Sequence, residues 1–166
     1  MKVDIKNSII KFKDGTTPTP NELEIKVGEG NFTFVERVAR EYALDKGRLD
    51  TVRNGDEQPV DVSLEFVWEW LKASTGNPPT PVDVLKRRGE ASAWVSSSAD
   101  PCEPYCVDIE ILINADCEDG TESELILIPD FRHEELNYDL RAGQIAVSGK
   151  ANVTSVTPTR IAYSTP

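Results

Sequence analysis

The stretch VDVSLEFVWEW, residues 60–70, has the most regular pattern in the chain and decides the fold class. After Pro59 every second residue is apolar, and the run closes on Trp68 and Trp70. Three of the intervening positions hold acids: Asp61, Glu65 and Glu69. A period of two is typical of a strand with one buried and one exposed face. The stretch therefore predicts an amphipathic strand with Phe66 and Trp68 in the core and carboxylates on its outer face.

The same period of two extends over most of the chain. It predicts further strands at residues 2–13, 22–27, 31–35, 91–98, 105–114, 121–128, 135–140 and 144–153. One short helix is expected at residues 82–88, with Thr80 as its N-cap and Gly89 at its end. Because most strands are amphipathic, the sheets should be antiparallel with one face covered. The expected fold class is therefore mainly β, an antiparallel β-sandwich or half-open barrel with one short α-helix.

Glycine and proline predict how these strands connect. Three short segments that contain glycine favour hairpin turns: Asp14-Gly15, Gly28-Glu29-Gly30 and Asn54-Gly55. The second of these should join residues 22–27 to residues 31–35. Pro129 should end the strand before it, because proline has no amide hydrogen to donate. Gly149 interrupts the inner face of its strand and predicts either a bulge or a close backbone approach.

Length and charge narrow the class of protein. The 166 residues fit one domain with its own core, spanning residues 1–166. No apolar run is long enough for a transmembrane helix, and the N-terminus lacks the apolar region of a signal peptide, so folding in a cytoplasm is expected. The formal net charge of −11 argues against a protein that grips nucleic acid by its phosphates. A net negative charge is compatible with two roles. It keeps a protein soluble through self-repulsion, or it forms a surface along which nucleic acid passes without binding.

Residues 36–59 differ from the rest of the chain. They hold six acids and five bases, so the segment is nearly neutral within an acidic protein. Turns are expected at Lys46-Gly47 and Asn54-Gly55, and few apolar side chains are present to pin the segment to its own domain. Long segments of this kind are commonly functional. We therefore predict a protruding arm that contacts another subunit.

No residue pattern indicates catalysis, a cofactor or a metal site. The single histidine, His133, is expected in a strand connection, and no nucleophile–base motif or specific pair of catalytic carboxylates is present. The cysteines are odd in number, which does not indicate a disulfide framework: Cys102, Cys106 and Cys117. We expect free thiols, and a single disulfide that forms late is the alternative. The acids of residues 116–122 do not match the EF-hand pattern for calcium.

The order of motifs resembles a known family. Three segments carry the likeness: GRLDTVRNGDEQPVDVSLEFVWEW (47–70), TPVDVLKRRG (80–89) and FRHEELNYDLRAGQIAVSGKANV (131–153). Together they resemble the tail tube protein of a long-tailed bacteriophage, a family related to type VI secretion tube proteins. The likeness covers roughly residues 20–155.

This resemblance implies a structural virion protein and not an enzyme. Six subunits would form a ring, and rings would stack into a tube through which genomic DNA leaves without specific binding. Expected partners are other copies of the chain and tape-measure, baseplate or tail-tip, tail-terminator and sheath proteins, with no membrane partner. The protein would assemble in the host cytoplasm and reside in the virion tail. Contacts between rings would come from the arm, the N-terminal strand 2–13 and the C-terminal tail, residues 154–166.

Two groups of site residues follow from the resemblance. A carboxylate-rich lumen would repel DNA over roughly 8 Å at physiological salt. Candidate lumen residues, expected on the sheet face turned from the core, are Asp61, Glu65, Glu69, Asp108, Glu110, Glu122 and Glu124. Candidate contacts between rings are Arg37, Arg40, Lys46, Arg48, Asp50, Arg53 and Asp56. Trp70, at the end of its strand, fits either the core or a contact between subunits.

A binding module is the alternative. A carbohydrate-binding or adhesin domain would use exposed aromatic side chains in a cleft, and the candidates are Trp94, Tyr105 and Tyr138. Trp68 and Trp70 exposed together in one groove would favour this interpretation. An enzyme on the same fold has no supporting residue constellation.

Overall fold

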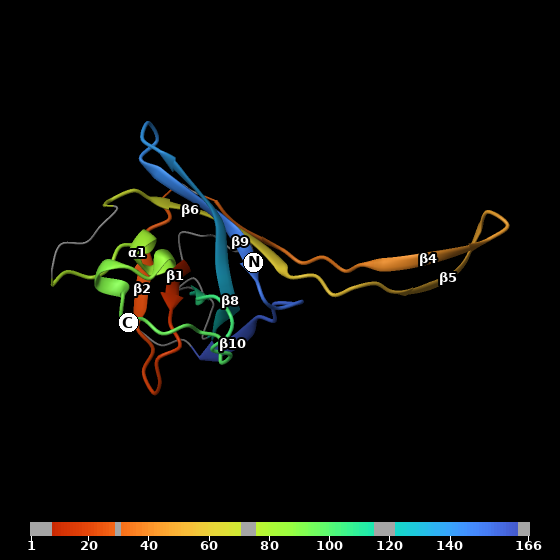
Figure 1. The fold of residues 1–166 in the computed structure, drawn as a ribbon, viewed down its shortest axis with the longest axis horizontal. Helices are drawn as coiled ribbons and strands as arrows, with labels where there is room; N and C mark the ends of the chain where they lie inside the picture. Colours follow the sequence, from red (N-terminus) through yellow and green to blue (C-terminus); the bar gives the residue numbers. More distant parts are fainter. Residues whose placement is uncertain (1–7, 29–30, 71–75, 115–121, 163–166) are drawn as a thin grey trace.

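The computed structural model describes residues 8–28, 31–70, 76–114 and 122–162 (Figure 1). Its elements are β1 (Ser8–Lys13), β2 (Glu22–Ile25), β3 (Phe32–Val35), β4 (Arg40–Asp45), β5 (Arg48–Asn54), β6 (Val60–Val67), α1 (Pro81–Lys86), a 3₁₀ turn η2 (Gly89–Ala91), β7 (Val107–Ile113), β8 (Glu122–Asp139), β9 (Gln144–Ala151) and β10 (Thr159–Ala162). One antiparallel sheet has the order β2-β1-β7-β8-β9-β6-β3, with β10 paired to β8. β4 and β5 form a separate two-stranded sheet.

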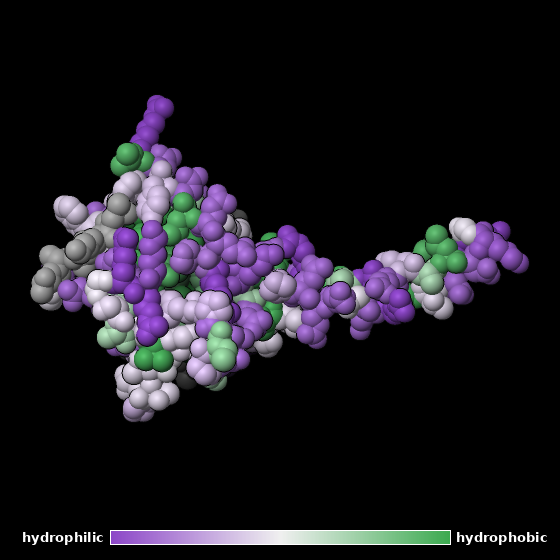
Figure 2. Space-filling model, viewed as in Figure 1, coloured by the Kyte–Doolittle hydropathy of each residue, from purple (hydrophilic) through white to green (hydrophobic). Residues whose placement is uncertain are grey.

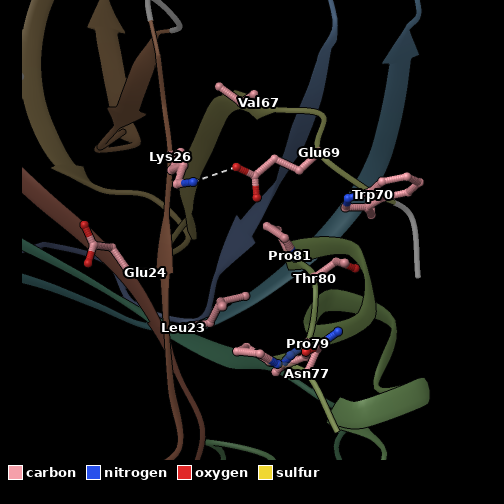
Figure 3. Close-up of a pocket in the computed structure, with 11 residues that line it drawn as sticks. Leu23, Glu24, Lys26, Val67, Glu69, Trp70, Asn77, Pro79, Thr80 and Pro81 are labelled. Carbon is pink, nitrogen blue, oxygen red and sulfur yellow. Dashed lines mark hydrogen bonds and ion pairs between the residues drawn. The ribbon is translucent and has the colours of Figure 1, made fainter. Parts of the chain in front are cut away.

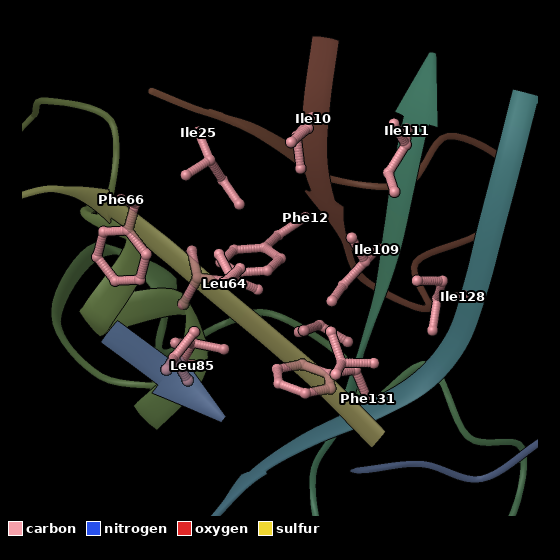
Figure 4. Close-up of a cluster of buried hydrophobic side chains, with 14 of the residues drawn as sticks. Ile10, Phe12, Ile25, Leu64, Phe66, Leu85, Ile109, Ile111, Ile128 and Phe131 are labelled. Carbon is pink, nitrogen blue, oxygen red and sulfur yellow. The ribbon is translucent and has the colours of Figure 1, made fainter. Parts of the chain in front are cut away.

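The large sheet is open and curls around the core. β2 and β3 stand at its two ends and do not pair with each other. Side chains from β1, β6, β7, β8 and α1 converge on one interior (Figure 4). The mainly β fold class, with antiparallel strands in a half-open arrangement and one short helix, is confirmed.

The opening stretch forms β6 and behaves as its alternation predicts. Four of its side chains are at most 2% exposed: Val60, Val62, Leu64 and Phe66. Burying each of them stabilises the fold by about 1.5–3 kcal/mol. Trp68 lies at the margin of this core, half-buried against Tyr138 with ring centroids 5.6 Å apart. Trp70 is 76% exposed, so it is not a core residue.

The helix α1 (Pro81–Lys86) begins as the sequence predicts, but it ends two residues before the predicted last residue, Arg88. The Thr80 hydroxyl accepts a hydrogen bond from the Asp83 amide (3.3 Å), and Pro81 opens the first turn. Arg87 takes the left-handed conformation and ends the helix. Three apolar side chains of the helix are buried against the sheet: Val82, Val84 and Leu85. The short helix therefore contributes to one side of the core.

The predicted hairpin between residues 22–27 and 31–35 is wrong. β2 pairs with β1, whereas β3 pairs with β6 at the other end of the sheet order. Alternation identifies strands, but it does not identify their partners. The other two turn predictions are also wrong in detail. Residues 14–21 form a longer connection after Asp14-Gly15, and Asn54-Gly55 ends β5 instead of turning the chain.

Residues 91–98 do not form the predicted strand. The chain instead passes through η2 and a tight turn in which the Trp94 amide donates to the Ala91 carbonyl (3.1 Å). Trp94 is buried, and Val95 is bonded through both its amide and its carbonyl to the start of the β1–β2 connection. Tertiary contacts with distant backbone therefore override the local alternation.

Pro129 does not end a strand, because β8 runs continuously through it. The pairing of β7 with β8 shifts register here, and Asp130 has a positive φ of 54°. The Asp130 amide, displaced from the ladder, donates to the Asp108 carboxylate (3.0 Å). Proline is tolerated at such a bulge because no ladder bond is required of it.

Gly149 confirms the predicted close backbone approach. It lies buried in β9, opposite a register shift between His133 and Glu135 in β8. A Cβ atom at Gly149 would lie 2.0 Å from the Arg132 carbonyl oxygen. Only glycine therefore fits where the two strands approach.

The C-terminal segment belongs in part to the sheet. Predicted as an irregular tail, it contains β10, which pairs with residues 122–125 of β8. Val156 is buried, and its amide donates to the Glu36 carboxylate. Likewise β1 lies between β2 and β7, so residues 8–13 form part of the central sheet. The remainder of both predicted contact segments, residues 2–7 and 163–166, lies outside the described residues.

Asp14 joins three parts of the chain and provides a stability test. Its buried carboxylate accepts hydrogen bonds from Thr16, Asn21 and the Val95 amide at 2.6–3.1 Å. Burial alone would raise the pKa of Asp14, but these hydrogen bonds lower it below its ordinary value. The ionised form therefore stabilises the native state, and this contribution is lost as the pH falls through the lowered pKa.

We expect Asp14→Ala to lower the free energy of unfolding by about 1–3 kcal/mol at pH 7, because several donors lose their acceptor. Urea unfolding at pH 7 and pH 3 measures this difference, which should shrink at pH 3. The exposed Asp50→Ala is the matched control and should change stability little. A gap of equal size at both pH values would contradict the assigned role of the carboxylate.

Candidate assembly surfaces

The arm, residues 36–59, is a β-hairpin that projects far from the sheet (Figure 1). β4 and β5 are joined by Lys46-Gly47, whose φ angles of 50° and 80° suit a two-residue hairpin turn. The predicted protrusion and this turn are present, whereas the regular strand pairing of the arm was not predicted. Every residue of both strands is exposed.

One face of the hairpin carries an apolar stripe. Tyr42 pairs with Val52, and Leu44 pairs with Leu49 beyond a register shift. These four side chains are 57–75% exposed. Figure 2 shows apolar surface near the tip of an otherwise polar arm. Contiguous exposed apolar side chains on a protein surface commonly mark an interaction site.

The other face of the hairpin is charged and internally paired. Arg53 forms an ion pair with Glu41, and Arg48 stands opposite Asp45 in register. A two-stranded hairpin alone is marginally stable in water. The arm therefore combines a weakly supported hairpin with an uncovered apolar face, which suits a segment that packs against a partner.

The base of the arm is fixed to the sheet. Arg37 forms an ion pair with Asp61 on β6, and the Gly55 amide donates to the Ala39 carbonyl (3.0 Å). The chain then passes from β5 to β6 over residues 55–59. The arm is thus an extension of the two neighbouring strands β3 and β6.

The seven predicted contacts between rings fall into two places. Five lie on the hairpin or its turn: Arg40, Lys46, Arg48, Asp50 and Arg53. Arg37 and Asp56 lie at the base, and Arg37 is engaged with Asp61. The structure thus brings five of them together on the projecting element, and their role between rings stays a prediction.

The seven predicted lumen acids do not share one face. Four lie on the outer face of the sheet: Asp61, Glu65, Asp108 and Glu110. Glu122 and Glu124 have the same alternation as the buried Ile126, which places them on the inner side at the start of β8. The expectation of a shared outward face is therefore wrong for these two. Glu69 lies beyond the end of β6. Their exposure to a lumen stays a prediction.

Basic neighbours offset part of this acidity. The ion pairs are Asp61–Arg37, Asp61–Lys150 (3.7 Å), Glu110–Lys13, Glu69–Lys26 (2.7 Å) and Glu122–Arg160 (3.6 Å). Burial raises the pKa of Asp108, although the Asp130 amide opposes this in part. The surroundings of the seven candidate acids are therefore less negative than the acids alone suggest.

A groove that the sequence did not predict lies past the end of β6 (Figure 3). Its volume is about 640 Å³. Six apolar side chains line it: Leu23, Val67, Trp70, Pro78, Pro79 and Pro81. Glu24 and the ion pair between Lys26 and Glu69 add charge to its walls. The sequence signals for this groove were Trp70, beyond the end of its strand, and the prolines before the helix. These residues come next to β2 only in the folded chain.

The aromatic side chains proposed for a carbohydrate cleft do not gather in one. Trp94 is buried, and Tyr105 is half-buried beneath Arg87, with its hydroxyl enclosed. Tyr138 packs on Trp68 at the margin of the core. Trp68 does not line the groove that contains Trp70. The two tryptophans are therefore not exposed in a shared groove.

Chemical sites are sparse in the described part of the chain. His133 lies within β8 and not in the predicted connection, and burial lowers its pKa. Cys102 and Cys106 are free, and Cys117 lies outside the described residues. No cluster of three potential metal ligands occurs among the described residues. The acids at 116–121 considered for calcium lie outside them. No described helix has the length and apolar character needed to cross a membrane.

Comparison with solved structures identifies similar folds. One chain lies in the structure described as "Cryo-EM Structure of an Extracellular Contractile Injection System, PVC sheath/tube terminator in extended state", with a TM-score of 0.52 and 11% identity. The match covers 96% of this chain and 97% of that one. A second lies in the PVC sheath-tube complex in the extended state, with a TM-score of 0.50, 11% identity, and coverage of 96% and 93%. No family model and no curated protein matches the sequence. These likenesses show the fold.

Proposed function

We propose that this chain is a structural subunit of a phage-like tail tube, in which six copies form a ring and rings stack into a hollow conduit. The observation that carries the proposal is the exposed, amphipathic arm on an open sheet whose fold resembles chains of tube-containing injection systems over nearly its whole length. An apolar stripe of this kind is a liability in a monomer and useful in an assembly.

The sheet ends support assembly of the same kind. β2 and β3 are edge strands of an open sheet, so each has backbone groups that can pair with a neighbouring subunit. A contact between two different surfaces of identical subunits gives a closed ring when its rotation closes. In such a ring the outer sheet face, with Asp61, Glu65 and Glu110, would line the conduit and keep DNA from binding.

Partners follow from the assembly. The similar structures contain a sheath, a tube and a terminator, so a sheath or terminator protein is the class of partner that this subunit would meet. The particle would form in a host cytoplasm and remain part of the tail. A terminator would close a stack, whereas a tube subunit would continue it.

Cryo-electron microscopy of the purified chain tests the proposal. We expect six-membered rings and stacked tubes as protein concentration and salt rise, because salt screens repulsion between subunits of net charge −11. Isolated rings that never stack would favour a terminator. Monomers under every tube-forming condition would overturn the proposal.

A carbohydrate-binding module is the second candidate, favoured only by exposed Trp70 beside two acids in a groove. Binding of soluble glycans that is lost in Trp70→Ala would support it.

A further inference from the structure

We infer that the groove around Trp70 receives the apolar stripe of the arm from a second copy of the chain. The inference rests on the proposed function and specifies a contact that such an assembly uses. It adds the receiving surface, which lies on β2, the end of β6 and the segment before α1.

The stripe on the arm and the groove around Trp70 are both rich in apolar side chains. The stripe offers four exposed apolar side chains, Tyr42, Leu44, Leu49 and Val52, on one face of a narrow hairpin. The groove offers six apolar side chains around a volume of about 640 Å³, within the range of roughly 300–1,000 Å³ typical of binding pockets. Burial of each apolar side chain removes its surface from water, so docking would cover both surfaces at once.

Charge favours the same pairing. Residues 40–54 hold four bases and three acids, whereas the whole chain has a net charge of −11. The hairpin therefore has a small net positive charge, so an acidic second copy does not repel it. Its tip carries Lys46 and Arg48. The groove carries Glu24 and the ion pair between Glu69 and Lys26, so its lining has a net charge of −1. Complementary charges of this kind steer and orient a contact.

The positions of the arm and the groove on the molecule make the contact head-to-tail. The arm leaves the sheet at the start of β6, whereas Trp70 lies past the end of the same strand. In Figure 1 the arm and α1 stand at opposite ends of the molecule. A copy cannot reach its own groove with its own arm. The arm of each subunit therefore meets the groove of the next, which is a heterologous contact.

Two single variants should each break the contact from one side. Leu49→Asp removes the stripe's apolar tip, and Trp70→Ala removes a groove wall. Both side chains are at least 75% exposed, so the fold should be unaffected in thermal unfolding. We expect each variant to raise the protein concentration needed for assembly by at least about tenfold, as for a central aromatic or aliphatic contact. Trp70→Phe should restore assembly in part.

Mixing the two variants tests the head-to-tail arrangement. Leu49→Asp keeps an intact groove, and Trp70→Ala keeps an intact arm. An equimolar mixture should give a one-to-one dimer by analytical ultracentrifugation at concentrations where each variant alone is monomeric. A mixture that behaves as the average of its components would overturn the inference.

Photo-crosslinking identifies the receiving surface directly. A benzophenone amino acid in place of Leu49 should crosslink to residues 67–70 or 77–81 of a second copy, distinguished by isotope labelling. The same probe in place of Leu140, which is also exposed, should not label those residues. Rings or tubes with crosslinks from arm to arm, or elsewhere, would overturn this inference and leave the proposed function standing. A wild-type chain that never assembles would overturn both, and glycan binding that depends on Trp70 would reassign the groove.

Discussion

Replacing residues 40–54 by Asn-Gly is expected to give a folded monomer that does not form the rings or tubes proposed above. All strand residues of the hairpin are exposed, so their removal takes no side chain from the core. The replacement should close without strain, because the Gly55 amide already donates to the Ala39 carbonyl at 3.0 Å. That is the bond that closes a two-residue turn, and Asn-Gly is the sequence which such turns favour.

Circular dichroism and thermal unfolding should match wild type, while electron microscopy should show no assemblies. The control is the exchange Glu41→Arg with Arg53→Glu, which keeps the cross-strand ion pair and the apolar stripe. It should assemble. An unfolded replacement variant would show that the arm belongs to the core, and one that assembles normally would show that the arm is dispensable.

Gly149→Ala is expected to destabilise the fold by about 3 kcal/mol or more, at the upper end of what overpacking costs. The added Cβ would meet two backbone groups of β8, the Arg132 carbonyl oxygen at 2.0 Å and the His133 Cα at 2.8 Å. Backbone cannot rotate away as a side chain can, so β8 and β9 must separate. These strands lie in the middle of the sheet order.

Urea unfolding measures the effect, and Ser148→Ala is the control on the outer face of the same strand. Serine at 148 has partners in register on both β6 and β8, yet its Cβ is already accommodated. The control should change stability by less than about 1 kcal/mol. Equal effects of the two substitutions would show that β9 can shift away from the bulge without a large cost.

Alternation predicted the strands whose two faces meet different surroundings. β6 and β7 show this clearly, because their inner residues touch the core and their outer residues meet solvent or charged neighbours. The helix α1 was predictable for another local reason, since Thr80 and Pro81 act within one turn. The sequence is therefore sufficient to predict an element whose structure is determined by residues close together in the chain.

Long-range contacts account for the errors. Pro129 was expected to end a strand, but the bulge that accommodates it depends on the carboxylate of Asp108 from β7. The alternation around Trp94 predicts a strand, but the hydrogen bond from the Val95 amide to the Asp14 carboxylate holds these residues in a turn. Both partners are distant in sequence, so no local pattern contains them.

The same limit applies to the candidate surfaces. The arm was predictable as a protrusion because its composition differs from the rest of the chain, whereas its stripe required the β4–β5 register. The groove around Trp70 joins three separated segments and could not be predicted from any one of them. The acids of the outer face were visible in the sequence, but partners such as Lys13 and Lys150 come from other strands.

In the proposed assembly, the attachment of the arm to β6 would determine how each subunit bears tension. The chain runs from β5 through residues 55–59 directly into Val60, and the arm extends roughly along the direction of β6 (Figure 1). A pull on the arm therefore acts along that strand. It loads the eight residue pairs between β6 and β9 in shear, all at once, instead of opening them one after another. Antiparallel hydrogen bonds lie perpendicular to the strands, so tension along a stack of such subunits would meet the stiffest direction of the sheet.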